Sequence, residues 1–113
     1  MEEVNFNDLV SYVIQDNHIL LIDFYSPQCG PCKILAPILE RESKRYPSVK
    51  FIKIDVTKPE NQIRDGISKA ANITTVPTVV IYQQGIEKFR HPGILDPITL
   101  ETILKEKFDI IAQ

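Results

Sequence analysis

Cys29 and Cys32 are the residues of this chain best suited to chemistry, because thiolates attack disulfides and bind metals. Gly30 and Pro31 separate them, so the sulfur atoms can close into a small ring or open again. Pro31 suits the first turn of a helix, where a missing backbone N–H costs nothing, and Gly30 allows a sharp turn. The spacing favours a reversible dithiol–disulfide pair.

Two other interpretations of the cysteines stay open from the residues alone. A closed zinc site needs about four ligands, and the spacing of the two histidines, His18 and His91, does not help to supply them. Both histidines are predicted to be surface or loop residues. The cysteines could also be inert packing residues.

The segments on either side of the pair should position it. Residues 19–25 are apolar except for Asp23, which predicts a strand covered on both faces. A helix with an apolar side formed by Ile34, Leu35, Ile38 and Leu39 should follow, and Pro37 should kink it. Cys29 then lies at a helix N-terminus, where unpaired N–H groups and the helix dipole favour thiolate.

Helical and strand patterns alternate along the rest of the chain. Strands are predicted at 49–56, 78–82 and 86–90, with a turn at 83–85 between the last two. Further helices are predicted after an Asn7 cap, after a capping box at 57–60, and from Asp96 onward. The pattern predicts an α/β fold: a central mixed sheet of about four to five strands flanked by about four helices. The reactive loop should lie beyond the carboxyl end of a strand.

Composition excludes several classes of function. The 113 residues suggest one domain over 1–113, and the net charge of −2 argues against a nucleic-acid-binding or polybasic membrane surface. No apolar run approaches the about 20 residues of a membrane span. The acidic N-terminal residues lack a secretion signal, so a cytosolic (cytoplasmic) protein is expected. A monomer is also expected. Structural disulfides are rare in the cytosol, which favours a catalytic or metal-binding pair.

Asp23 is unusual because its neighbours are Leu21, Ile22, Phe24 and Tyr25. A buried, unpaired carboxylate is costly, and the usual response is a raised pKa, which suits a proton acceptor near neutral pH. The alternative is that Asp23 faces solvent from an edge strand or bonds to a backbone group.

The segment 23–33, with Ala36 and Pro37 after it, resembles the thioredoxin family. Downstream, Val76-Pro77-Thr78 is similar to the cis-proline loop of that family, Gly85 to its hairpin glycine and Gly93 to the glycine near its active site. The resemblance covers nearly the whole chain and implies a thioredoxin fold. It also implies protein disulfide reductase activity in cell redox homeostasis.

The resemblance implies roles for particular residues. Cys29 would be the nucleophile, Cys32 the resolving thiol of a Cys29–Cys32 redox disulfide, and Asp23 the proton acceptor. Active-site support would come from Gly30, Pro31, Lys33, Val76, Pro77 and Gly93, and substrate contacts from Gln28 and Tyr25. A lysine such as Lys53 would be a typical partner for Asp23. No bound cofactor or metal is implied; the partners would be oxidised protein substrates and an external NADPH-dependent thioredoxin reductase.

The chain departs from the family pattern at two places. Gln28 replaces the usual Trp before the first cysteine, which leaves substrate preference open. The stretch from 57 to 75 is longer than is typical, as in dedicated thiol–disulfide interchange domains. An oxidase or isomerase of the same fold and a non-enzymatic adaptor are the remaining alternatives.

Overall fold

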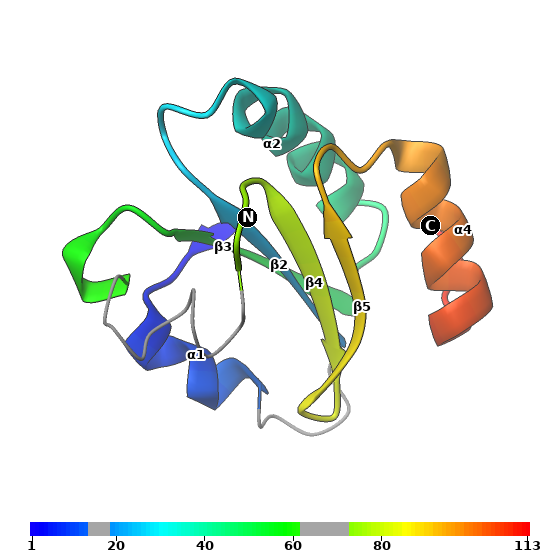
Figure 1. Cartoon of the computed structure of the whole chain (residues 1–113). Coiled ribbons are helices and arrows are strands. Elements are labelled where there is room, and N and C mark those ends of the chain that lie inside the picture. The colour runs from blue at the N-terminus through cyan, green and yellow to red at the C-terminus, as the bar shows by residue number, and fades with distance from the viewer. Residues whose placement is uncertain (14–18, 62–72) are drawn as a thin grey trace.

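The computed structural model describes residues 1–13, 19–61 and 73–113. Strands and helices alternate in the N-terminal part of the chain, and a hairpin of two strands precedes the last helix (Figure 1). Their order is β1 (Glu2–Glu3), α1 (Phe6–Val13), β2 (Ile19–Tyr25), α2 (Gly30–Ser43), β3 (Val49–Asp55), the 3₁₀ turn η1 (Pro59–Asn61), β4 (Thr78–Gln83), β5 (Ile86–Pro92) and α4 (Pro97–Phe108).

The five strands form one mixed sheet in the order β1-β3-β2-β4-β5. β1, β3 and β2 are parallel, whereas β4 runs antiparallel to β2, and β5 antiparallel to β4. The central position belongs to β2, which places Asp23 beside Lys53 of β3 on one side and Val79 of β4 on the other. The mixed sheet with helices on both faces confirms the predicted fold class.

The alternation of side chains along β2 divides the core between the two faces of the sheet. Leu21 lies in a cluster with Leu35 of α2 and Leu100 of α4, whereas Ile22 lies in a cluster with Leu9 of α1. Figure 1 shows the same division, with α2 and α4 over one face and α1 over the other. Because both faces are covered, a β2 that is apolar except for Asp23 is stable at the centre of the sheet.

Several predicted boundaries differ from the structure. Helix α1 begins at Phe6, so Asn7 lies inside it and does not cap it. The Thr57 hydroxyl donates to the Asp55 carboxylate at 2.6 Å, and the chain forms only the short η1 turn in place of the predicted helix start. The remainder of that predicted helix falls within 62–72, outside the described residues. In the described part of the chain, α1, α2 and α4 are the α-helices, one fewer than predicted, and none is long and apolar enough to cross a bilayer.

Candidate active site

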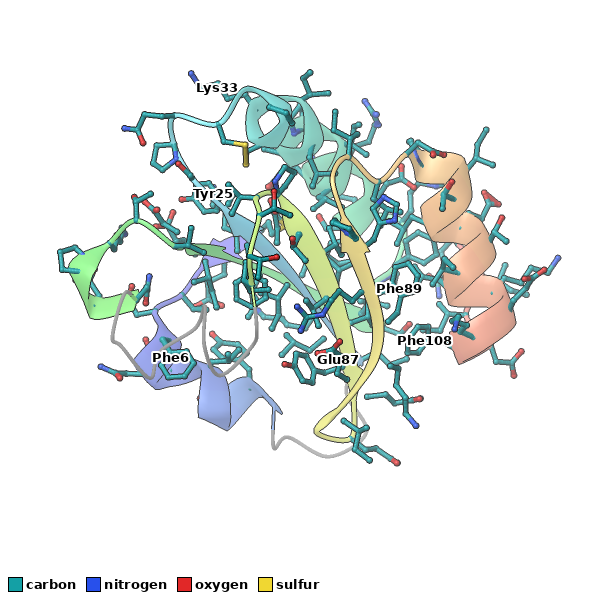
Figure 2. All side chains as sticks on the ribbon, in the orientation of Figure 1. Phe6, Tyr25, Lys33, Glu87, Phe89 and Phe108 are labelled. Carbon is teal, nitrogen blue, oxygen red and sulfur yellow. A yellow bond between two sulfur atoms is a disulfide. The ribbon has the colours of Figure 1, made fainter. Side chains whose placement is uncertain are left out.

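The two cysteines form a disulfide at the junction of β2 and α2 (Figure 2). Cys29 is the N-cap residue of α2, with an extended backbone at φ −87° and ψ 118°. Its sulfur accepts a hydrogen bond from the Cys32 amide at 3.1 Å, which pairs one of the otherwise unpaired N–H groups of the first turn. The first sulfur therefore lies in the electropositive environment of a helix N-terminus.

The two sulfur-bearing residues differ in exposure. Cys32 is buried, with 3% of its surface exposed, whereas Cys29 is half-buried and its neighbours Gly30 and Pro31 are exposed. Cys29 is therefore the more accessible residue of the pair.

Gly30 does not make the sharp turn predicted for it. It is the first residue of α2, its φ lies outside the left-handed region, and a Cβ added there would meet open space. Neither backbone strain nor a clash over the sulfur requires glycine at this position. The fit of Pro31 to the first helical turn is confirmed.

The loop before β4 lies against the disulfide. The Val76–Pro77 peptide bond is cis, as the resemblance implies, and the Val76 carbonyl oxygen lies 3.7 Å from the Cys29 sulfur. The amide of Gly93 donates to the Pro77 carbonyl oxygen at 2.8 Å, with Gly93 at φ +88°. The fold therefore joins three segments distant in sequence, around residues 29, 76–77 and 93, into one site.

Asp23 is buried on the central strand, with 1% of its surface exposed, so it does not face solvent from an edge strand. Its Oδ1 accepts no hydrogen bond from any described residue. Burial raises the pKa of this carboxyl to about 7, and the positive charge of Lys53 opposes part of that rise. Asp23 can therefore hold or release a proton near neutral pH.

The remaining predicted residues are more peripheral. Lys33 is exposed and points away from the ribbon in Figure 2, and Gln28 is exposed beside Ser26. Tyr25 is half-buried and donates its hydroxyl hydrogen to Glu3 at 2.8 Å. His91, predicted to be a surface or loop residue, is half-buried in the edge strand β5, and its Nε2 lies 3.1 Å from the Ile94 carbonyl oxygen. His18 lies outside the described residues.

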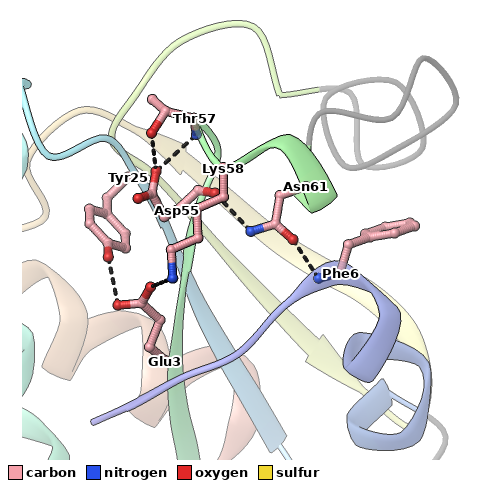
Figure 3. A network of polar contacts seen from close by, with 7 residues as sticks. All are labelled: Glu3, Phe6, Tyr25, Asp55, Thr57, Lys58 and Asn61. Atoms are coloured by element: carbon pink, nitrogen blue, oxygen red, sulfur yellow. Dashed lines mark hydrogen bonds and ion pairs between the residues drawn. The ribbon is translucent and has the colours of Figure 1, made fainter.

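Two further residues lie beside the site: Lys53, which the resemblance suggested as a partner for Asp23, and Glu3, which was not singled out from the sequence. Lys53 is the register partner of Asp23, and its ammonium lies over the Tyr25 ring, 5.6 Å from the centroid. Glu3 binds both the Tyr25 hydroxyl and the Lys58 ammonium, as Figure 3 shows. Glu3 gave no signal in the sequence, because the strand that carries it, β1, is only two residues long.

The other interpretations of the cysteines do not fit this geometry. A packing pair would leave two separate thiols, whereas the sulfurs here are bonded to each other. Within residues 1–13, 19–61 and 73–113, no group of three or more His, Cys, Asp or Glu side chains is arranged to hold a metal ion.

Comparison with known proteins shows the family to which this chain belongs. The family model described as Thioredoxin matches residues 1–106, and the chain belongs to the thioredoxin family. It is 37% identical over 73 residues to Thioredoxin 1 of Plasmodium falciparum, across 65% of this chain and 65% of that protein. It is 31% identical over 100 residues to the chloroplastic Thioredoxin M-type of Spinacia oleracea, across 88% of this chain and 53% of that protein. The matched part of each of these two relatives is thus less than two thirds of that relative's length.

A solved structure of Plasmodium falciparum thioredoxin has the same fold. The two share 30% sequence identity and superpose with a TM-score of 0.78, covering 94% of this chain and 99% of that one. Family membership and the Cys29–Cys32 disulfide together support thiol–disulfide oxidoreductase chemistry.

Proposed function

We propose that this protein is a protein disulfide reductase and that the Cys29–Cys32 couple transfers two electrons to oxidised protein substrates. The observation that supports this most strongly is the disulfide itself, whose more exposed residue, Cys29, lies at the N-terminus of α2. The reduced dithiol is the active form, and the disulfide is the state left after one turnover.

The first step forms one bond and breaks another. The Cys29 thiolate attacks one sulfur of a substrate disulfide; a mixed disulfide forms, and the other substrate sulfur leaves as a thiolate that takes up a proton. In the second step Cys32 loses its proton to the Asp23 carboxylate and attacks the Cys29 sulfur. The Cys29–Cys32 bond forms as the mixed disulfide breaks, and the second substrate sulfur leaves as a thiolate that takes up a proton, so the substrate now carries two thiols.

The Val76–Pro77 loop is proposed as the surface on which an extended substrate segment lies. The Val76 backbone is next to the Cys29 sulfur, and backbone pairing with an extended peptide is a common mode of recognition. The Gly93 amide supports this loop through its hydrogen bond to the Pro77 carbonyl oxygen. Gln28 is exposed and directly precedes Cys29 in the sequence. Gly30, Pro31 and Lys33 complete the proposed surround of the pair.

The disulfide must be reduced again after each turnover. We assign this step to an external thioredoxin reductase, since thioredoxin-family proteins work with that enzyme and with oxidised protein substrates. We propose that the electrons come from NADPH. A reducing compartment such as the cytosol suits a chain whose two cysteines both belong to the redox pair. One relative is named as chloroplastic, so family membership alone does not define the compartment. We propose a monomer of one domain.

Trapping of mixed disulfides tests this function. A Cys32→Ser variant keeps the attacking thiol but lacks the resolving one, so it should accumulate disulfide-linked substrate proteins that dithiothreitol releases. The matched Cys29→Ser variant should trap far fewer, because its remaining sulfur is buried. Equal trapping by the two variants, or none by either, would contradict the assignment.

A further inference from the structure

We infer that Tyr25 is a positioning residue that holds the Lys53 ammonium on its ring and away from the Asp23 carboxylate. The inference rests on the proposed function, in which Asp23 accepts the proton of Cys32. This role of Tyr25 differs from the substrate contact that the family resemblance implies.

The arrangement of β2 and β3 gives Lys53 two possible partners. Asp23 and Tyr25 are two residues apart in β2, so they share one face of the sheet, and Lys53 is the register partner of Asp23. The Lys53 ammonium lies 5.6 Å from the Tyr25 ring centroid, a cation–π distance. Among the described residues no ion pair joins Lys53 to Asp23, whose Oδ1 is left without a hydrogen bond.

The Tyr25 ring is itself held in place from the edge of the sheet. Its hydroxyl donates to Glu3 at 2.8 Å, and the same carboxylate forms a 2.7 Å ion pair with Lys58 (Figure 3). Partial burial and the bond to Glu3 raise the pKa of Tyr25, so the hydroxyl stays a donor. The ring therefore offers Lys53 a fixed surface.

The charged groups around this face come from three elements. β3 supplies Lys53 and Asp55, β1 supplies Glu3, and α2 supplies Glu40, whose charge interacts with that of Lys53. The β4 neighbour of Asp23, Val79, is apolar. Lys53 is thus the cation that lowers the pKa of Asp23, and the distance between these two groups controls the strength of the effect.

A double-mutant cycle on the titration of Asp23 tests the inference. The four proteins are the wild type, Tyr25→Leu, Lys53→Met and the double variant, all in the disulfide form so that no thiol titrates. The probe is the carbon-13 chemical shift of the Asp23 carboxyl as a function of pH. Because no substrate is needed, failure here is distinguishable from failure of the reductase assignment.

We expect Tyr25→Leu to lower the pKa of Asp23 by about one unit, because the released ammonium can pair with the carboxylate. Lys53→Met alone should raise it, and adding Tyr25→Leu to Lys53→Met should then change it by less than about 0.3 units. An equal downward shift in both backgrounds would mean that hydration acts and Lys53 does not. That result, or no shift in either single variant, would overturn the inference.

Tyr25→Phe provides the matched control. It removes the bond to Glu3 but keeps the ring under Lys53, so its Asp23 pKa should stay closer to the wild-type value than that of Tyr25→Leu. Equal shifts in the phenylalanine and leucine variants would show that the ring is not the group that holds Lys53.

Discussion

At the scale of single residues, Asp23 shows most clearly how the fold creates chemistry. The carboxyl has an ordinary pKa of 3.8, and burial on the central strand raises it to about 7. The folded state therefore prefers the neutral acid. This contribution to stability is fully present below the unfolded value and is lost as the pH rises through the folded one.

Replacing Asp23 by Asn should remove the part of the pH dependence of stability that this carboxyl causes. At about pH 8 the free energy of unfolding of the variant should exceed that of the wild type by on the order of 2–4 kcal/mol, because no buried charge has to form. At about pH 4 the two proteins should be nearly equal. Urea unfolding of the disulfide forms at both pH values measures the difference.

Asp109→Asn is the matched control, since Asp109 is an exposed carboxylate at the left-handed C-cap of α4, a conformation that Asn tolerates. Because the Asp109 carboxylate is exposed, this substitution removes no buried charge, and the variant should lack the gain in stability expected for Asp23→Asn at about pH 8. A constant difference between Asp23→Asn and wild type from about pH 4 to 8 would contradict the account.

At the scale of elements, the N-terminus of α2 makes the two sulfurs unequal. Cys29 combines the N-cap position with partial exposure, whereas Cys32 is buried behind it. The positive end of a helix stabilises an anion, and only an accessible thiolate reacts.

Alkylation of the reduced protein should report this inequality. In Cys32→Ser, the Cys29 thiol should react with iodoacetamide near neutral pH at least about tenfold faster than the Cys32 thiol does in Cys29→Ser. Mass spectrometry of quenched samples gives both rates. Equal rates, or a faster Cys32, would be inconsistent with the proposed order of attack.

Gly93, in the loop between β5 and α4, is the subject of a second prediction at the scale of elements. Gly93 has φ +88° with open space around a Cβ, so Gly93→Ala should cost about 1 kcal/mol or more from backbone conformation alone. Gly30→Ala is the matched control, because Gly30 has helical backbone and similar open space. That change should be neutral or stabilising by up to about 1 kcal/mol. Denaturant unfolding compares them; equal effects would contradict the argument.

At the scale of the whole molecule, β2 joins the two halves of the core. Leu21 and Ile22 are adjacent and fully buried, yet they belong to clusters on opposite faces of the sheet. If the chain is one cooperative unit, as we propose, damage to either face should destabilise both.

Leu21→Ala and Ile22→Ala should therefore each lower the free energy of unfolding by about 2–5 kcal/mol, with one shared transition seen by circular dichroism and by tyrosine fluorescence. Ile98→Ala, at a side chain that is 77% exposed, should change it by less than about 0.5 kcal/mol. Separate transitions for the two probes would contradict a single unit.

The sequence was sufficient to predict the parts of this molecule that depend on local patterns. The apolar run of β2, the helix after it and the Cys29–Cys32 spacing are all continuous segments, and they predicted the reactive junction. The two-residue strand β1 was not located, because so short a segment has no periodicity. The positions of Glu3 and Lys53 beside Tyr25 depend on strand order and register, which arise only when distant segments pair.

Stoichiometric reduction of insulin by the pre-reduced protein, with no other reductant present, tests the central claim most directly. One insulin disulfide should be cleaved for each protein molecule oxidised, and mass spectrometry should show that this protein has lost two hydrogen atoms in forming the Cys29–Cys32 bond. Cys29→Ser should cleave none. Intact insulin beside a fully reduced wild-type protein would contradict the account.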